Sequence, residues 1–146
     1  MKIFFDTTVL VAAVVRDHPH HARARAATDE VVAGETHGVV GGHALLETYS
    51  VLTRLPVTPR IGPDAAQRIV DGNIVEHFDV VALSAREYTR LVRTLASRAT
   101  AGGATYDALH LACAAKSGAD RIYTFNVADF RRLAPDEETR ARIAAP

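Results

Sequence analysis

Five oxygen-bearing side chains, far apart in the sequence, stand beside short apolar segments and could share one site. Asp6 is the plainest case, because it directly follows the apolar residues Ile3, Phe4 and Phe5. In open α/β sheets, ligands bind beyond the carboxyl ends of the strands, so side chains at such ends can meet in one pocket. The candidate site residues are Asp6, Glu47, Asp107, Asn126 and Asp129.

Carboxylates gathered in this way repel one another and are costly to bury unless a cation neutralises them. Mg²⁺ and Mn²⁺ are the natural candidates, because these ions prefer oxygen ligands and keep several waters. Two such ions about 3.5–4 Å apart can clamp the attacking and leaving oxygens of a phosphoryl displacement. The chemistry indicated is hydrolysis of a phosphodiester.

Taken singly, each acid also has a structural interpretation. Asp6 could only accept a hydrogen bond from the next turn, and Glu47 could be a solvated helix residue. Asp107 could serve only the dipole of its helix, since an anion is favoured in the first turn. The joint placement of the three acids favours a metal site over these separate interpretations.

Short apolar segments that alternate with helical ones must position these acids. Residues 3–5, 37–40, 78–83 and 121–125 are the predicted strands. The predicted helices cover residues 7–14, 20–32, 43–54, 64–76, 84–100 and 105–116. This alternation predicts an α/β fold with three layers, α/β/α, around a central parallel sheet of four or five short strands.

Several residues have the chemistry of helix ends. Ser84, with Glu87 three positions later, makes a capping box, and Thr105 is a candidate N-cap for the helix that carries Asp107. Residues 1–135 are expected to form one nuclease-like domain. The tail, residues 136–146, is rich in Glu, Arg and Ala and is expected to be a frayed surface helix.

Length and composition indicate one ordinary globular domain, because the chain has 146 residues, of which 48% are hydrophobic and 23% charged. Lys+Arg and Asp+Glu both number 17, so any nucleic-acid contact needs a local patch rather than a global positive field. The lone Cys113 excludes a disulfide framework and is expected to be buried. No apolar run reaches the roughly 18 residues of a membrane span, so we expect a cytoplasmic protein with no membrane partner.

Four segments resemble the motifs of PIN-domain ribonucleases, and among these the VapC-like toxins of type II (VapBC) toxin–antitoxin systems. Three segments hold residues similar to the family's acids, and the fourth is similar to its closing motif. The resemblance extends from Met1 to about Leu133, and the segment around Asp107 is the most specific. The segments are IFFDTTVL (3–10), LLETYSVL (45–52), TYDALHLA (105–112) and TFNVADF (124–130).

The resemblance implies a PIN-like fold and a Mg²⁺-dependent endoribonuclease, with Mn²⁺ as a substitute. Asp6 and Asp107 would be direct ligands, and Glu47 would be a ligand or would orient the attacking water. The partners implied are a VapB-like antitoxin, an RNA substrate such as tRNA or rRNA, and a second copy of the chain in a homodimer. Hydroxyl groups would hold a carboxylate or water, and the candidates are Thr7, Thr8 and Thr124.

The closing segment departs from the family pattern. Where the family often has an acid, this chain has Asn126, which can coordinate through its carbonyl oxygen but brings no charge. Asp129 could supply the missing carboxylate, directly or through water, or could be a structural cap beside Phe130. The departure keeps open an alternative function, a catalytically weakened PIN-like module that binds antitoxin or RNA without cleavage.

A phosphatase with Asp6 as nucleophile is disfavoured, because Thr8 stands where such enzymes carry a second acid.

Histidines also invite a metal assignment. Residues 17–21 read DHPHH, and imidazoles suit transition metals, but a polar loop that leads into a helix explains the same composition. His110 lies three residues after Asp107 on one helical face. His110 could therefore touch the site, but we expect it to be a hydrogen-bonded, buried histidine.

Two surface features could serve partners. Arg93 and Arg98 precede the helix of Asp107 and could form a cleft wall that grips RNA. The apolar stretches 9–15 and 45–55 could form a groove for an antitoxin segment or a dimer face.

Overall fold

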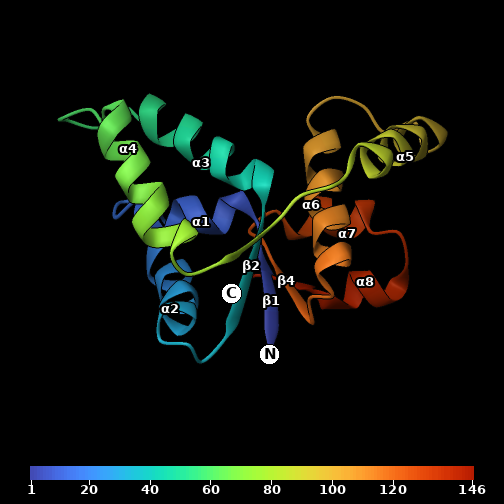
Figure 1. Cartoon of the computed structure of the whole chain (residues 1–146), viewed down its shortest axis with the longest axis horizontal. Coiled ribbons are helices and arrows are strands. Elements are labelled where there is room, and N and C mark those ends of the chain that lie inside the picture. Colours follow the sequence, from blue (N-terminus) through green and yellow to red (C-terminus); the bar gives the residue numbers. More distant parts are fainter.

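Five short parallel strands form the central sheet of the structure, a computed structural model that describes residues 1–146 (Figure 1). Every pairing between neighbouring strands is parallel. The α/β class and the parallel sheet expected from the sequence are therefore confirmed. In spatial order the strands are β3 (Asp79–Val81), β2 (His37–Gly41), β1 (Lys2–Phe5), β4 (Arg121–Tyr123) and β5 (Ile143–Ala144).

The strand register determines which residues meet at the carboxyl edge of the sheet. Phe5, the last residue of β1, lies opposite Val40 of β2 and Tyr123 of β4. Asp6 and Thr124 directly follow β1 and β4, so they emerge at the same edge. Helix α3 (Gly42–Arg54) begins there too, directly after β2.

Helices cover both faces of the sheet, which gives the expected three layers (Figure 1). Ile3 and Phe5 belong to the core on one face, and Phe4 belongs to the core on the other. Strand β1 is therefore buried on both sides, which explains its unbroken apolar sequence. The helices on the first face are α1 (Thr7–Val14) and α2 (His21–Val32), and those on the second are α6 (Ala104–Ser117) and α7 (Val127–Leu133).

Two helical arms extend past the carboxyl edge of the sheet (Figure 1). One is α3 with α4 (Pro63–Val70), which continues into the π-helical turn η1 (Asp71–Val75). The other includes α5 (Ala85–Ser97), and its expected capping box is confirmed: Ser84 N–H donates to Glu87 Oε2 (2.6 Å), and Glu87 N–H donates to Ser84 Oγ (3.3 Å). None of the helices combines the length and the apolar character needed to cross a lipid bilayer.

The beginning of α6 differs from the expected one. Thr105 is not the N-cap, because the helix already begins at Ala104, after Gly103. Gly102 has a φ of 64°, a conformation that suits glycine, and its carbonyl accepts from Thr105 N–H at 3.1 Å. The glycine turn therefore starts the helix in place of a hydroxyl cap.

The C-terminal residues form a surface helix, as expected, but the helix is capped and the chain then adds a strand to the sheet, which the sequence did not predict. Helix α8 (Glu137–Arg142) is capped by Asp136, whose carboxylate accepts from Thr139 N–H at 2.7 Å. Strand β5 then pairs with β4, and Ile143 is fully buried against the second core. A strand of two residues has too short a pattern to be recognised from the sequence.

Candidate functional site

A polar pocket of about 460 Å³ opens at the carboxyl edge of the sheet. It brings together four of the five predicted site residues, which are Asp6, Glu47, Asp107 and Asn126. They come from the end of β1, from α3, from α6 and from the residue before α7. The convergence follows from the parallel sheet, whose strand ends share one edge.

Asp6 is the most deeply held of the acids. Its buried Oδ2 accepts from Thr8 Oγ1 at 2.6 Å and from Thr124 Oγ1 at 2.9 Å. The same carboxylate caps α1, where Thr8 N–H lies 3.4 Å from Oδ2. These contacts fix the carboxylate through Oδ2, while its Oδ1 lies 3.7 Å from His110 Nε2.

Thr124 and Thr8 also connect the two segments that surround Asp6, the turn after β4 and the beginning of α1. Thr124 Oγ1 accepts from Asn126 N–H at 2.9 Å, and Thr8 Oγ1 accepts from Phe125 N–H at 3.0 Å. The turn after β4 is thus tied to the first turn of α1. Thr124 therefore lies where the sequence placed it, beside a carboxylate, whereas Thr7 contacts a different acid.

Glu47 is a half-buried acceptor for three side chains. Thr7 Oγ1 donates to Oε2, and His110 Nε2 donates to the same oxygen at 2.9 Å. His43 Nε2 lies 3.1 Å from Oε1, one helical turn away on α3. Burial alone would raise the pKa of Glu47, but the hydrogen bonds from His110 and Thr7 and the nearby histidine charges lower it. Glu47 is therefore held as a carboxylate.

Asp107 differs from the other acids, because no protein group donates a hydrogen bond to its side chain and no cation pairs with it. It lies half-buried in the first turn of α6. Burial is the first cause that raises its pKa to about 6, and the negative charge of Asp6 is the second. The charge of His110 opposes this shift, while Asp129 and Glu47 add to it. An ionised Asp107 thus lacks a positive partner.

His110 lies at the centre of the acids. Its Nε2 is 2.9 Å from Glu47, 3.4 Å from Thr7 Oγ1 and 3.7 Å from Asp6 Oδ1. Burial alone would lower the pKa of His110, but the hydrogen bond to Glu47 and the charges of the acids outweigh it and raise the pKa. The prediction of a hydrogen-bonded, buried histidine is confirmed, and the other possibility, that His110 touches the site, is also realised.

Asp129 lies apart from the other predicted site residues. Its side chain is 55% exposed, does not line the pocket and pairs with Arg132 at 3.0 Å. Its charge still contributes to the raised pKa of Asp107, so it is close enough to act electrostatically. Asn126 lines the pocket but makes no side-chain cap for α7.

The donor set suits a hard divalent cation. In the structure no group of three or more His, Cys, Asp or Glu side chains is close enough to bind one ion jointly. However, Asp107 is an unpaired carboxylate whose ionised form is disfavoured by its acidic neighbours, and a cation would relieve this repulsion. The residues that could hold the ion are Asp6, Glu47 and Asp107, with Asn126 as a neutral oxygen donor.

The histidines of the loop before α2 make structural contacts. The His20 ring stacks on Phe125 with centroids 4.2 Å apart, and His18 Nδ1 accepts from His20 N–H at 3.1 Å. The ring of His21 hydrogen-bonds to the carbonyl of Ala12 at 2.9 Å. These contacts explain the loop composition without a ligand.

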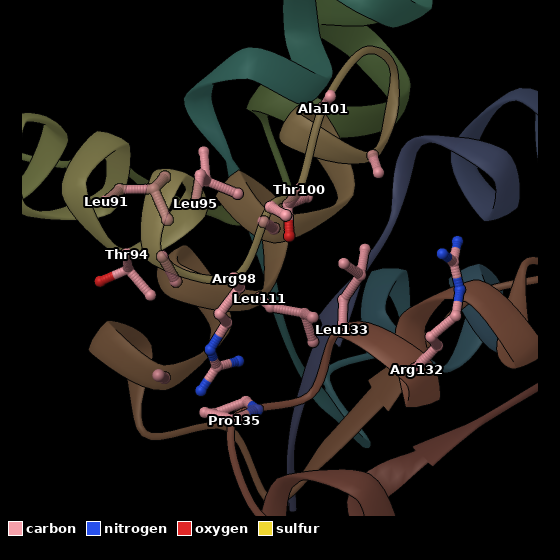
Figure 2. Close-up of a pocket in the computed structure, with 15 residues that line it drawn as sticks. Leu91, Thr94, Leu95, Arg98, Thr100, Ala101, Leu111, Arg132, Leu133 and Pro135 are labelled. Carbon is pink, nitrogen blue, oxygen red and sulfur yellow. The ribbon is translucent and has the colours of Figure 1, made fainter.

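A second pocket, of about 580 Å³, lies between α5, α6 and the end of α7 (Figure 2). Leu91, Leu95 and Leu133 make its lining mainly apolar, and Arg98 lies at its edge. Arg98 therefore borders this apolar pocket, not the acidic one. The arginine that does line the acidic pocket is Arg54, at the end of α3, which the sequence reasoning missed.

The two apolar stretches have different environments. Val9, Leu10, Ala12 and Ala13 are buried in the core, so this stretch cannot serve as a groove for a partner. In the second stretch Leu46 remains 70% exposed beside the acidic pocket.

Similarity to known proteins agrees with this geometry. The family model described as PIN domain matches residues 3–135. The chain is 42% identical over 118 residues to Ribonuclease VapC27 of Mycobacterium tuberculosis, covering 79% of this chain and 78% of that protein. It is 36% identical over 138 residues to Ribonuclease VapC40 of the same organism, covering 94% of each chain.

Solved structures share the fold at low sequence identity. The crystal structure of Mycobacterium tuberculosis VapC20, a sarcin-ricin loop cleaving toxin, aligns with a TM-score of 0.66 and 21% identity, covering 87% of this chain and 92% of that one. VapBC2 from Rickettsia felis, bound to a DNA fragment from its promoter, aligns with a TM-score of 0.63 and 18% identity, covering 92% and 94%.

Proposed function

Because this chain belongs to the PIN-domain family and is VapC-like, we propose that it is a toxin of a toxin–antitoxin pair that hydrolyses RNA phosphodiester bonds with Mg²⁺. The observation that carries the metal dependence is the unpaired carboxylate of Asp107 beside Asp6 and Glu47. The ribonuclease names of its relatives support RNA as the substrate. Structured RNAs, including tRNA and rRNA, are the substrates to test.

Mg²⁺, or Mn²⁺ as a substitute, would supply Lewis-acid chemistry that polarises a phosphoryl oxygen and activates a water. Asp6 and Asp107 are the proposed direct ligands. Thr8 and Thr124 hold Oδ2 of Asp6 by hydrogen bonds, so the carboxylate keeps one orientation at the wall of the pocket. Fixed ligands of this kind lower the cost of reorganisation during the reaction.

Glu47 is proposed to bind the cation or to orient the attacking water. Its Oε2 is already hydrogen-bonded by Thr7 and His110, which leaves Oε1, beside His43, as the oxygen nearer to a ligand. His110 keeps a proton on Nε2 in this arrangement and holds the carboxylate of Glu47 near Asp6. We therefore assign His110 a positioning role.

Asn126 and Asp129 have lesser proposed roles. Asn126 would offer a neutral oxygen from the wall of the pocket. Asp129 would act through its charge or through water, since its side chain is exposed and paired with Arg132. A normal metal affinity in Asp129→Asn would remove it from the ligand set.

A VapB-like antitoxin is the proposed partner, and it would occlude the acidic pocket. A homodimer is the proposed assembly. The resemblance supports both proposals, and the similarity to a VapBC2 complex supports the antitoxin partner. Size-exclusion chromatography with light scattering, alone and with the product of a neighbouring small gene, would test them.

The alternative is a PIN-like module that binds antitoxin or RNA without cleavage. Asn126 favours it, because an amide replaces a negative charge beside the site. Metal titration separates the two functions, since a pure binding module would show no carboxylate-dependent binding of Mn²⁺.

The test of the proposed activity is cleavage of structured RNAs by purified, antitoxin-free protein in Mg²⁺ or Mn²⁺. We expect cuts at discrete positions that disappear with EDTA and in Asp6→Asn. EDTA removes the divalent cation, and the substitution removes a carboxylate that is proposed to bind it. The exposed Asp17→Asn variant is the matched control and should cut normally. Cleavage that persists in EDTA, or that is unchanged in Asp6→Asn, would reject the metal-dependent function.

A further inference from the structure

An aromatic pair lies beside the acidic pocket, because His43 lines the pocket and Tyr106 directly precedes Asp107, which also lines it. The rings of His43 and Tyr106 stack with centroids 4.9 Å apart and an interplanar angle of 7°. His43 belongs to α3 and Tyr106 to α6, so the pair joins the two helices that carry Glu47 and Asp107. Its position is therefore tied to the acids.

The contacts of His43 fix this position further. Its Nε2 lies 3.1 Å from Oε1 of Glu47, and its ring lines the pocket. Tyr106 directly precedes Asp107 in the first turn of α6. A group stacked on this pair would therefore lie close to Glu47, one helical turn after His43, and to Asp107, next to Tyr106.

Tyr106 presents an aromatic surface to solvent. Its side chain is 50% exposed, although the ring stacks on His43, and it is absent from the apolar cores. Leu46 is 70% exposed on the neighbouring helix and lines the same pocket. Apolar and aromatic surface beside a polar pocket is what an unpaired base needs for stacking.

The charge distribution leaves stacking as a main source of RNA affinity. Lys+Arg and Asp+Glu balance at 17 each, and Arg54 is the single arginine or lysine among the residues that line the acidic pocket. Phosphate contacts supply most non-specific nucleic-acid affinity, and they need cations. A chain with few cations at its site must obtain affinity from bases or from a bound metal.

We propose that Tyr106, supported by His43, is a stacking platform for an unpaired RNA base beside the cleaved phosphodiester. This inference rests on the proposed ribonuclease function. The platform stacks on the flat face of a base. This face is accessible in single-stranded or looped RNA but is covered by neighbouring bases in paired RNA, so the platform favours unpaired RNA. The neighbouring phosphate would then lie beside the cation that Asp6 and Asp107 are proposed to hold.

The test combines cleavage kinetics with direct binding. Steady-state cleavage of a short unpaired substrate gives KM and kcat for the wild type, Tyr106→Ala and Tyr106→Phe. Binding is measured by quenching of 2-aminopurine, placed next to the cut, with proteins that also carry Asp6→Asn. Tyr88→Ala is the matched control, because Tyr88 is 44% exposed on α5 and lies outside the lining of the pocket. Unfolding midpoints and Mn²⁺ affinity verify that each variant is folded with its acids in place.

We expect Tyr106→Ala to raise KM about 10-fold with little change in kcat, and to abolish the quenching, because a lost base stack costs about that factor. Tyr106→Phe should behave like the wild type, since it keeps the ring, and so should Tyr88→Ala. If Tyr106→Ala loses Mn²⁺ affinity or stability, Tyr106→Leu serves in its place, because it keeps apolar bulk without an aromatic face.

Each other outcome has a separate meaning. Normal KM and quenching in Tyr106→Ala, with an active wild type, would overturn the platform alone. Quenching that depends on Tyr106 in a protein that cuts no RNA would overturn the proposed function and keep the platform. A wild type that neither cuts nor quenches would overturn both.

Discussion

Asp6 illustrates how single hydrogen bonds position a carboxylate of the proposed metal site. Thr124 is fully buried, donates to Asp6 Oδ2 at 2.9 Å and accepts from Asn126 N–H at 2.9 Å. Thr8 makes the equivalent link on the other side. The two hydroxyls thus hold the acid and its surrounding turns together.

Removal of the Thr124 hydroxyl should lower both stability and activity. Thr124→Val keeps the shape but leaves a buried carboxylate and an amide with one partner fewer. We expect a loss of about 1–3 kcal/mol in the free energy of unfolding, measured in urea, and weaker RNA cleavage. Thr89→Val is the control, since that hydroxyl is exposed and bonds only to a carbonyl of its own helix. Equal stability of the two variants would contradict the role of Thr124.

The raised pKa of Asp107 predicts a pH dependence in metal-free protein. Its pKa is raised from 3.8 to about 6, so the group stabilises the fold fully below about pH 3.8 and loses this contribution as the pH rises through about 6. Asp107→Asn removes the charge. In EDTA the variant should therefore be more stable than the wild type at pH 8, with a smaller difference at pH 5, by urea unfolding. A difference that does not change with pH would show that no such shift exists.

For single residues, the sequence predicted the positions of the acids better than those of the other residues around them. Asp6, Glu47 and Asp107 could be found because they sit next to strand ends or in apolar helices. Asp129 could not be placed, because its side-chain direction depends on how α7 begins after Asn126. Arg54 was missed although it lies on the same face of α3 as Glu47, two helical turns later, because the sequence does not show how far the pocket extends along that helix.

Among the elements, α3 contributes most to the site. His43, Glu47 and Val51 recur at intervals of four residues and line the pocket, as neighbouring turns of one helix face. The helix can reach the acids because it starts directly after β2, at the same edge as Asp6. Its position is therefore a consequence of strand register.

Strand β5 provides the clearest test at the scale of elements. Ile143 is fully buried between β4 and the second core, so Ile143→Ala should leave a cavity. We expect a loss of about 2–3 kcal/mol in the free energy of unfolding, measured in urea. Val92→Ala, at a side chain that is 64% exposed, should change stability by less than about 0.5 kcal/mol. A neutral Ile143→Ala would mean that the C-terminal strand does not stabilise the fold.

The elements differ in how well the sequence predicted them. Long segments with strong caps, such as α5 with its Ser84 and Glu87 box, were found within a few residues. The short β5 and the glycine start of α6 were not, because their signals depend on a neighbouring strand or on a φ value rather than on periodicity.

In the whole molecule, two helical arms stand on either side of the sheet edge that carries the acids (Figure 1). The acidic pocket lies between residues of α3 and α6, and the apolar pocket lies beneath α5 (Figure 2). With Lys+Arg and Asp+Glu balanced at 17 each, the molecule has no overall attraction for RNA. The proposed activity therefore depends on the local charge that a cation would bring to the acids.

The most direct measurement of this central claim is Mn²⁺ binding to antitoxin-free protein at pH 7.5, followed by calorimetry and by the electron paramagnetic resonance of free Mn²⁺. We expect the wild type to bind, and Asp6→Asn, Glu47→Gln and Asp107→Asn each to lose at least about 10-fold in affinity, while the exposed Asp17→Asn matches the wild type. Absence of binding in the folded wild type, or binding that none of the three substitutions weakens, would contradict the claim that these acids form a divalent cation site.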